Sequence, residues 1–566
     1  MTLKLSNNKK RRLNGLAEQA LAYASKGQFA AALKFCDKAD SLSNNFSEIV
    51  YVRGISAAMQ GDYASACTWL EQASKAMPKN LSLMINLANS LLFSNREEEA
   101  APLYAHILEK NPQLFEKANG YGAYAIALSE LGEYNQAMQH FDEAIKRIQS
   151  GDLELIKKAA HICHVRRNSD KAISLLESAR ASHPTNHSIP FQMALLLMQW
   201  NRNDEARSLL RETLRIHPDH IEALSLLVVS GDYEERPADI ARLQTIYEQA
   251  ENDSNARLLG AYTLGDEADK AGEYSEAFNY WSEGNRVRRA QVAYHDAEQE
   301  RLFKAAIAPF PAERFTHSVC EGASSDAAPI FIVGMPRCGS SLLERALSMH
   351  PDLTDAGEIS ALQQSIAGRM HKPSTALIIE KLESLDDAGF LEVGSEYARR
   401  IAEEYNIDGR TIDKSLGNFG LIGAIAKALP NARILHLARD PMASCLSMFQ
   451  AHFTAGVNYS FDLDELGRHY NRYLKAMQHW REVLPQGVML EVHYEDLVSN
   501  TESELRRTLE FCNLEWNAAC LQPHKAGGSV STASIFQVRK PIHQKSIARW
   551  KHYEEQLAPL KKHLKQ

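Results

Sequence analysis

The sequence predicts two parts: an array of paired α-helices, followed by a three-layer α/β domain with a mainly parallel sheet. In the first half, alanines recur about every 34 residues. In the second half, short uninterrupted apolar runs lead into turns, which is typical of strands buried on both faces. The length of 566 residues also exceeds the roughly 100–200 residues of a single domain. We therefore expect at least two packing units.

The helical array is predicted from a repeated six-residue motif. A glycine, a polar residue, an aromatic residue and, three positions later, an alanine occur at 27–32, 61–66, 132–137 and 272–277. The closing alanines at 32, 66, 100, 137, 172 and 206 are 34, 34, 37, 35 and 34 residues apart. In a helix pair, glycine can form the turn and alanine lets two backbones approach closely. This period resembles that of tetratricopeptide repeats, so we predict a tetratricopeptide superhelix over 13–300.

Such repeats cover each other's apolar faces and form a concave surface. The resemblance therefore implies a peptide or protein partner, while a homodimer through the array is an equal alternative. Proline breakers at 309 and 311 and the small polar stretch 321–326 predict a linker over 301–327. The second domain is then expected over 328–566.

Composition excludes several classes of function. With 63 Lys and Arg against 71 Asp and Glu, the net charge of -8 does not favour nucleic-acid binding, which needs a concentrated basic face. The sequence contains neither an apolar signal core nor a run of 18 apolar residues, so we expect a cytoplasmic protein without a membrane span. The eight cysteines are scattered, and no metal site is predicted.

The second domain opens with a candidate anion site. Residues 330–333 read as a buried strand and the leucines after residue 341 as a helix. A loop over 334–341 that joins a strand end to a helix start directs backbone N–H groups at one point. The loop nearly fits the triphosphate pattern G-x-x-x-x-G-K-[ST], but Ser340 stands in place of the lysine. The planar guanidinium of Arg337 can still donate two hydrogen bonds to an oxyanion. This favours a nucleotide whose transferred group is carried on a single 5′-phosphate.

Two motifs in this half resemble one enzyme family. The loop sequence Pro-Arg-Cys-Gly-Ser-Ser at 336–341 is similar to the 5′-phosphosulfate loop of sulfotransferases that use 3′-phosphoadenosine-5′-phosphosulfate. A predicted strand at 433–438 ends in Arg-Asp-Pro at 439–441, which resembles the family's 3′-phosphate site. The resemblance covers roughly 329–560 and is closest to tyrosylprotein sulfotransferases and to bacterial proteins that join tetratricopeptide repeats to such a domain.

The resemblance implies which residues bind the donor. Those expected at the 5′-phosphosulfate are Arg337, Cys338, Gly339, Ser340 and Ser341, and those at the 3′-phosphate are Arg439 and Ser447. Tyr494 matches a family tyrosine near the nucleotide. Ser534 and Lys540 fall in a stretch that resembles a segment closing over the 3′-phosphate and adenosine.

The resemblance also implies the catalytic residues. Glu358 matches the family's general base, Lys414 the cation that offsets charge on the transferring group, and Arg337 acts beside it. The tyrosylprotein members carry two adjacent glutamates, whereas Ile359 follows Glu358 here. The acceptor is thus expected to be a hydroxyl or an amine, a protein tyrosine among the candidates, and transfer to be a direct in-line displacement without a metal.

Two other functions remain open from the sequence. A kinase could use the same loop, although Ser340 in the lysine position counts against it. A repeat scaffold with a degenerate nucleotide-binding domain would perform no chemistry. The joint presence of Arg337, Glu358, Lys414, Arg439 and Ser447 argues for the enzyme.

Overall fold

The computed structural model describes residues 6–117, 119–147, 152–315, 328–368, 373–526, 539 and 541–564. The chain divides into two compact units, the first up to residue 175 and the second from residue 176 onward. Within the described ranges, every helix is too short or too polar to cross a membrane.

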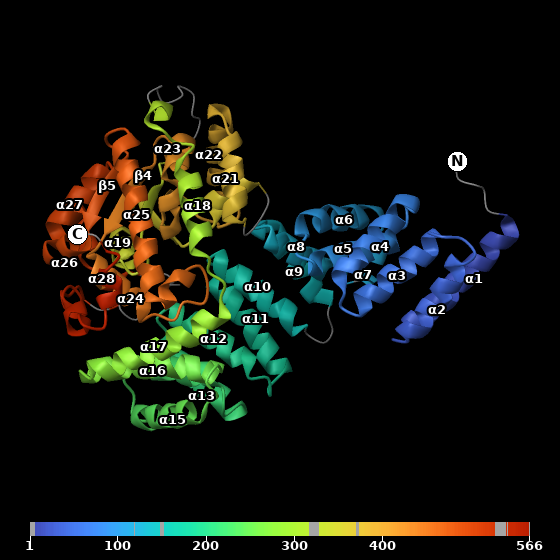
Figure 1. Cartoon of the computed structure of the whole chain (residues 1–566), viewed down its shortest axis with the longest axis horizontal. Helices are drawn as coiled ribbons and strands as arrows, with labels where there is room; N and C mark the ends of the chain where they lie inside the picture. Colours follow the sequence, from blue (N-terminus) through green and yellow to red (C-terminus); the bar gives the residue numbers. More distant parts are fainter. Residues whose placement is uncertain are drawn as a thin grey trace. The chain divides into compact units, whose positions relative to one another are not determined.

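The first unit consists of paired helices (Figure 1). Its helices are α1 (Asn7–Ala24), α2 (Phe29–Asp40), α3 (Ser47–Met59), α4 (Tyr63–Ala76), α5 (Leu81–Phe93), α6 (Glu97–Lys110), α7 (Pro112–Lys117), α8 (Gly120–Glu130), α9 (Tyr134–Arg147) and α10 (Leu153–Val165). The turn between α3 and α4 shows how the motif works. Gly61 adopts a φ of 81°, and the Asp62 carboxylate accepts a hydrogen bond from the backbone N–H of Ser65 at 3.1 Å, which caps α4.

The repeats continue into the second unit. The next helices are α11 (Ser169–Ser182), α12 (Ser188–Gln199), α13 (Asn203–Ile216), α14 (Ile221–Val229), α15 (Arg236–Gln249), α16 (Asn255–Ala271), α17 (Tyr274–Gln291) and α18 (Asp296–Ile307). The six periodic alanines, at 32, 66, 100, 137, 172 and 206, all have 0% exposure, as close helix packing requires. Helix α18 crosses residue 300, where the predicted array ends and the predicted linker begins.

A five-stranded parallel sheet follows, in the order β2-β3-β1-β4-β5. The strands are β1 (Ile330–Gly334), β2 (Leu353–Gly357), β3 (Arg410–Asp413), β4 (Arg433–Ala438) and β5 (Met489–His493). Every residue of β1 is buried, which explains its uninterrupted apolar sequence. Because all strands are parallel, their carboxyl ends meet at one edge of the sheet.

Helices cover both faces of the sheet. The remaining helices are α19 (Ser340–Leu347), α20 (Ala361–Ala367), α21 (Thr375–Ser384), α22 (Asp387–Glu403), α23 (Ile422–Ala428), α24 (Pro441–Phe449), α25 (Leu463–Val483), α26 (Tyr494–Ser499), α27 (Thr501–Phe511) and α28 (Ala558–Lys561). Leucines of α19 and α27 share one core with Ile330 and Ile332. On the opposite face, Phe331 contacts Tyr397 of α22 at 5.5 Å between ring centroids. The predicted three-layer α/β arrangement is confirmed.

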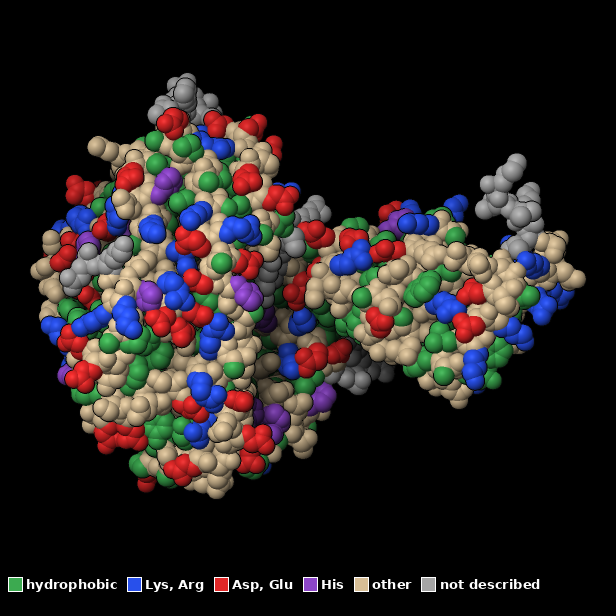
Figure 2. All heavy atoms as spheres, in the orientation of Figure 1, with side chains coloured by type: hydrophobic (Ala, Val, Ile, Leu, Met, Phe, Trp, Pro, Cys, Tyr) green, Lys and Arg blue, Asp and Glu red, His purple; other side chains and the backbone are tan. Residues whose placement is uncertain are grey.

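The last repeat helices pack directly on the α/β domain. The amide of Asn285 in α17 donates to the backbone carbonyl of Phe449 at the end of α24 at 2.8 Å, and Asn285 is 1% exposed. Arg289 pairs with Glu465 of α25 at 2.8 Å. Figure 2 shows basic and acidic side chains interspersed on the face that it presents. The second unit thus joins repeat helices and sheet in one body.

Candidate active site

The loop between β1 and α19 forms one side of a cavity at the carboxyl edge of the sheet. Gly339 has a φ of 100°, and a Cβ there would overlap the ring of Tyr494, so the position suits glycine alone. Ser340 and Ser341 are the first two residues of α19 and line the cavity. Backbone N–H groups at a helix start are suited to an anion.

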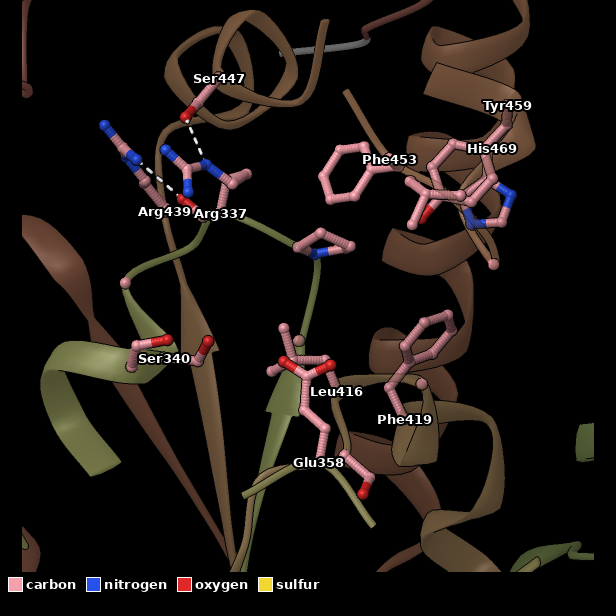
Figure 3. Close-up of a pocket in the computed structure, with 18 of the residues that line it drawn as sticks. Arg337, Ser340, Glu358, Leu416, Phe419, Arg439, Ser447, Phe453, Tyr459 and His469 are labelled. Atoms are coloured by element: carbon pink, nitrogen blue, oxygen red, sulfur yellow. Dashed lines mark hydrogen bonds between the residues drawn. The ribbon is translucent and has the colours of Figure 1, made fainter. Parts of the chain in front are cut away.

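Two arginines meet beside this loop (Figure 3). Arg439, at the end of β4, donates to the backbone carbonyl of Arg337 at 2.7 Å and to that of Ser546 at 3.0 Å. The Nε of Arg337 donates to the hydroxyl of Ser447 in α24 at 3.1 Å. Burial, with the neighbouring charge of Arg439, lowers the pKa of Arg337 to about 10. Two adjacent, partly buried cations would be stabilised by an anion between them.

Residues at the end of β5 and after residue 541 lie next to Arg439. The guanidinium of Arg439 lies 4.5 Å from the ring centroid of Tyr494, and the hydroxyls of Tyr494 and Ser546 are 2.7 Å apart. Arg549, which also lines the cavity, pairs with Asp269 of α16 at 2.5 Å. A repeat helix therefore helps to hold the cationic end of the cavity.

A lysine between two glutamates lies at the ends of β2 and β3. Glu358 follows β2, and its carboxylate is 2.6 Å from the Nζ of Lys414, which follows β3 and has 0% side-chain exposure. Glu344 of α19 lies 3.8 Å from the same Nζ. Burial alone would lower the pKa of Lys414, but the two carboxylates raise it above its ordinary value. Burial raises the pKa of Glu344 to about 7.

These strand ends border one cavity of about 1140 Å³. The predicted residues that line it are Arg337, Gly339, Ser340, Ser341, Glu358, Arg439, Ser447 and Tyr494. Lys414 lies beneath the lining and contacts Glu358. The side chain of Cys338, however, is 1% exposed and belongs to the core under the sheet, where burial raises its pKa to about 11. Cys338 can contribute to the cavity through its backbone only. Ser534 and Lys540 lie outside the described residues.

The sequence interpretation missed two contributors. Glu344 was not predicted, because its burial depends on tertiary packing. Its position one turn into α19, next to the loop, could have indicated that it lies near the site. The second is helix α18, which lines the cavity with Gln299, Leu302, Phe303, Ala306 and Ile307. Their spacing of three and four residues marks one face of a helix, and the sequence contains this signal.

Both parts of the chain are similar to known proteins. Residues 329–518 match the sulfotransferase family, and residues 57–118, 118–150 and 167–228 match tetratricopeptide repeats. An uncharacterized protein of Aquifex aeolicus is 25% identical over 539 residues, which cover 92% of this chain and 70% of that protein. Protein-tyrosine sulfotransferase 1 of Danio rerio is 32% identical over 246 residues, which cover 40% of this chain and 66% of that protein.

The chain spans 62% of the length of another relative, protein-tyrosine sulfotransferase 2 of Gallus gallus, at 25% identity. Among solved structures, the sulfotransferase domain of the Synechococcus olefin synthase aligns with a TM-score of 0.31 and 19% identity, over 40% of this chain and 90% of that domain.

Proposed function

We propose that this protein transfers a sulfuryl group from 3′-phosphoadenosine-5′-phosphosulfate to an acceptor hydroxyl or amine, because residues 329–518 match the sulfotransferase family and earlier residues match tetratricopeptide repeats. One observation carries the proposal. The cations at the ends of β1 and β4 meet at one end of a single cavity, and the Glu358 carboxylate lines the same cavity (Figure 3).

The cationic end fits a donor with two anionic groups. The start of α19 with Arg337 would hold the 5′-phosphosulfate, and Arg439 with Ser447 the 3′-phosphate. Four lining residues carry Lys or Arg side chains, at 337, 439, 545 and 549. Glu358 is the one carboxylate among the described residues of the lining. The excess of positive charge at this end favours a polyanionic ligand.

Different residues of the chain would then perform different steps of the transfer reaction. The bound donor supplies an activated sulfuryl group. Glu358 accepts the proton of the acceptor hydroxyl as the acceptor oxygen bonds to sulfur. The bond between sulfur and the phosphate oxygen breaks in line, and its electron pair stays on the phosphate. Lys414 and Arg337 offset the negative charge that builds on that oxygen.

Titration calorimetry tests the donor. We expect the protein to bind 3′-phosphoadenosine-5′-phosphate and not adenosine triphosphate. The reverse result would support the kinase that the loop alone left open. Arg439→Ala should weaken binding at least about tenfold, because a charge-assisted contact contributes about 1.5–3 kcal/mol. The exposed Arg506→Ala controls for the loss of one positive charge.

Transfer of labelled sulfate tests the catalytic role. Lys414→Ala should lower kcat by about 100-fold or more, as removal of a transition-state donor commonly does, with little change in nucleotide binding. If Lys414→Ala and Arg439→Ala lose binding equally, the proposed division between catalysis and binding is wrong.

We also propose that the repeats bind a protein or peptide, or a second copy of the chain. Large apolar side chains are exposed in the first unit, among them Met59 at 51% and Phe93 at 63%, and such surfaces favour association. Sedimentation of the wild type and of Phe93→Ser tests the homodimer. A dimer should weaken in the variant, whereas a wild type that stays monomeric at micromolar concentration would contradict self-association.

A further inference from the structure

The side chains that line the cavity differ in chemical type on the two sides of Glu358. In Figure 3, Arg337, Arg439 and Ser447 lie on one side of this carboxylate. The labelled side chains on the other side are Phe419, Phe453, Tyr459 and His469. A donor at the cationic end would leave the aromatic side for the acceptor. The cavity volume of about 1140 Å³ exceeds the roughly 300–1,000 Å³ of most single-ligand sites, which leaves room for two molecules.

Helix α18 builds one wall of the aromatic side. Leu302, Phe303 and Ile307 face the cavity from one stripe of the helix. The ring of Phe303 lies 5.6 Å from that of Phe419 and 5.4 Å from that of His469, the latter edge to face. The α18 wall is therefore continuous with the aromatic residues of the α/β domain.

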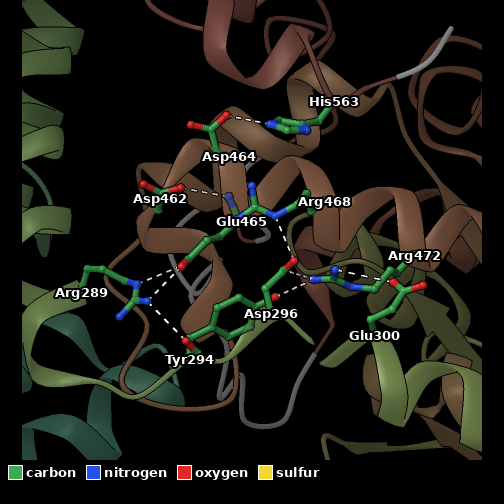
Figure 4. A network of polar contacts seen from close by, with 10 residues as sticks. All are labelled: Arg289, Tyr294, Asp296, Glu300, Asp462, Asp464, Glu465, Arg468, Arg472 and His563. Carbon is green, nitrogen blue, oxygen red and sulfur yellow. Dashed lines mark hydrogen bonds and ion pairs between the residues drawn. The ribbon is translucent and has the colours of Figure 1, made fainter. Parts of the chain in front are cut away.

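Ion pairs fix the start of this helix to α25 (Figure 4). Asp296 accepts from Arg472 at 2.6 Å and from Arg468 at 3.0 Å. Arg472 is 6% exposed and also donates to the hydroxyl of Tyr294 at 2.8 Å. Arg472 is buried while Asp296 is about one-third exposed, so these contacts position the start of α18 against α25.

The described residues that line the aromatic side include no Lys or Arg, and the nearby Arg288 and Arg472 lie behind the lining. Among the described residues, the Lys and Arg side chains of the lining belong to the loop, to the end of β4 and to the segment after residue 541. Burial lowers the pKa of His452 to about 4 and that of His469 to about 3, so both imidazoles are neutral at pH 7. An anionic acceptor would face the Glu358 carboxylate, which already pairs with Lys414, and would find no Lys or Arg of the described lining beside it, which is unfavourable.

Building on the proposed function, we propose that the acceptor is an uncharged, largely apolar alcohol or phenol. Its carbon skeleton lies against α18 and the facing aromatic rings, and its hydroxyl reaches Glu358. Each apolar group that enters this side leaves water for an apolar surface, which favours binding. Helix α18 is then a specificity-determining element of the transferase.

A series of phenols tests the acceptor class. Labelled transfer is measured with 4-methyl-, 4-ethyl-, 4-propyl- and 4-butylphenol, with 3-(4-hydroxyphenyl)propionate as a carboxylated match, and with a tyrosine peptide flanked by glutamates. We expect kcat/KM to rise up to about fourfold per added methylene. The carboxylated phenol should react at least about 100-fold more slowly than 4-butylphenol, because its charge would be buried without a partner.

Leu302→Lys adds a cation to the α18 wall. It should shift the ratio of kcat/KM for the carboxylated phenol over 4-butylphenol upward by about tenfold. Ala297→Lys places the same charge at an exposed position of the same helix and should leave this ratio unchanged. An unaltered ratio in Leu302→Lys, with 3′-phosphoadenosine-5′-phosphate still bound, would overturn the assignment of α18.

The acceptor proposal and the proposed function can fail separately. If labelled sulfate goes to the acidic peptide or to the carboxylated phenol in preference to 4-butylphenol, the acceptor class is wrong while sulfuryl transfer stands. If 3′-phosphoadenosine-5′-phosphate does not bind and no acceptor is labelled, the proposed function itself fails.

Discussion

Replacing Glu344 by Gln should remove a specific part of the protein's pH-dependent stability. Glu344 is 6% exposed, and its pKa rises from an ordinary value of 4.5 to about 7 in the folded chain. Because the folded pKa is higher, the neutral carboxyl stabilises the fold below pH 4.5, and this contribution is lost as the pH rises through 7. One pKa unit corresponds to about 1.4 kcal/mol, so the loss between pH 5 and pH 8 is roughly 2–3 kcal/mol.

Urea unfolding at pH 5, 6, 7 and 8 measures this contribution. The free energy of unfolding of the wild type, minus that of Glu344→Gln, should fall by this amount across the range. Agreement between circular dichroism and fluorescence transitions checks that each unfolding step is two-state. Glu392→Gln makes the same charge change at an exposed position. A difference that stays constant from pH 5 to pH 8 would refute the reasoning from burial.

Three further changes probe the site and its supports. Gly339→Ala should abolish binding of 3′-phosphoadenosine-5′-phosphate in calorimetry, because its Cβ would overlap Tyr494. Asn285→Ala leaves the carbonyl of Phe449 without its buried donor and should lower the free energy of unfolding by about 1–3 kcal/mol in denaturant titrations. Asp296→Asn weakens the ion pairs that hold α18, and should raise the KM of the acceptor more than that of the donor in initial-rate kinetics.

Each of these predictions has a contrary outcome. Gly15→Ala, at a glycine of α1 where a Cβ would meet open space and which does not line the cavity, is the control for Gly339→Ala, and equal effects would exclude the steric argument. Unchanged stability in Asn285→Ala would show that water replaces the lost donor. Equal changes in both KM values for Asp296→Asn would mean that α18 supports the whole cavity and not the acceptor side alone.

The sequence predicts those parts of the site that depend on short, local sequence motifs. Arg337 and Arg439 each sit in a short motif at a strand end, and parallel strands bring such ends to one edge of a sheet. The repeated alanines predict helix pairs because the packing partner is the next segment of the chain. The sequence could not place Cys338, whose neighbours in the motif line the cavity while its own side chain turns into the core.

Long-range contacts account for what the sequence interpretation missed. Burial raises the pKa of Glu344, and Lys414, which lies 70 residues further along the chain, opposes this rise. Asp269 contacts Arg549 across 280 residues. Neither pair has a spacing or a composition that differs from ordinary surface residues, so the fold alone reveals them.

Helix α18 lies at 296–307, outside the residues 329–518 that match the sulfotransferase family. Under the proposed function, one wall of the acceptor side is therefore encoded outside the family match, although the facing aromatic residues lie within it. Substitutions along one helical stripe could redirect the enzyme to new acceptors while the phosphate loop stays intact.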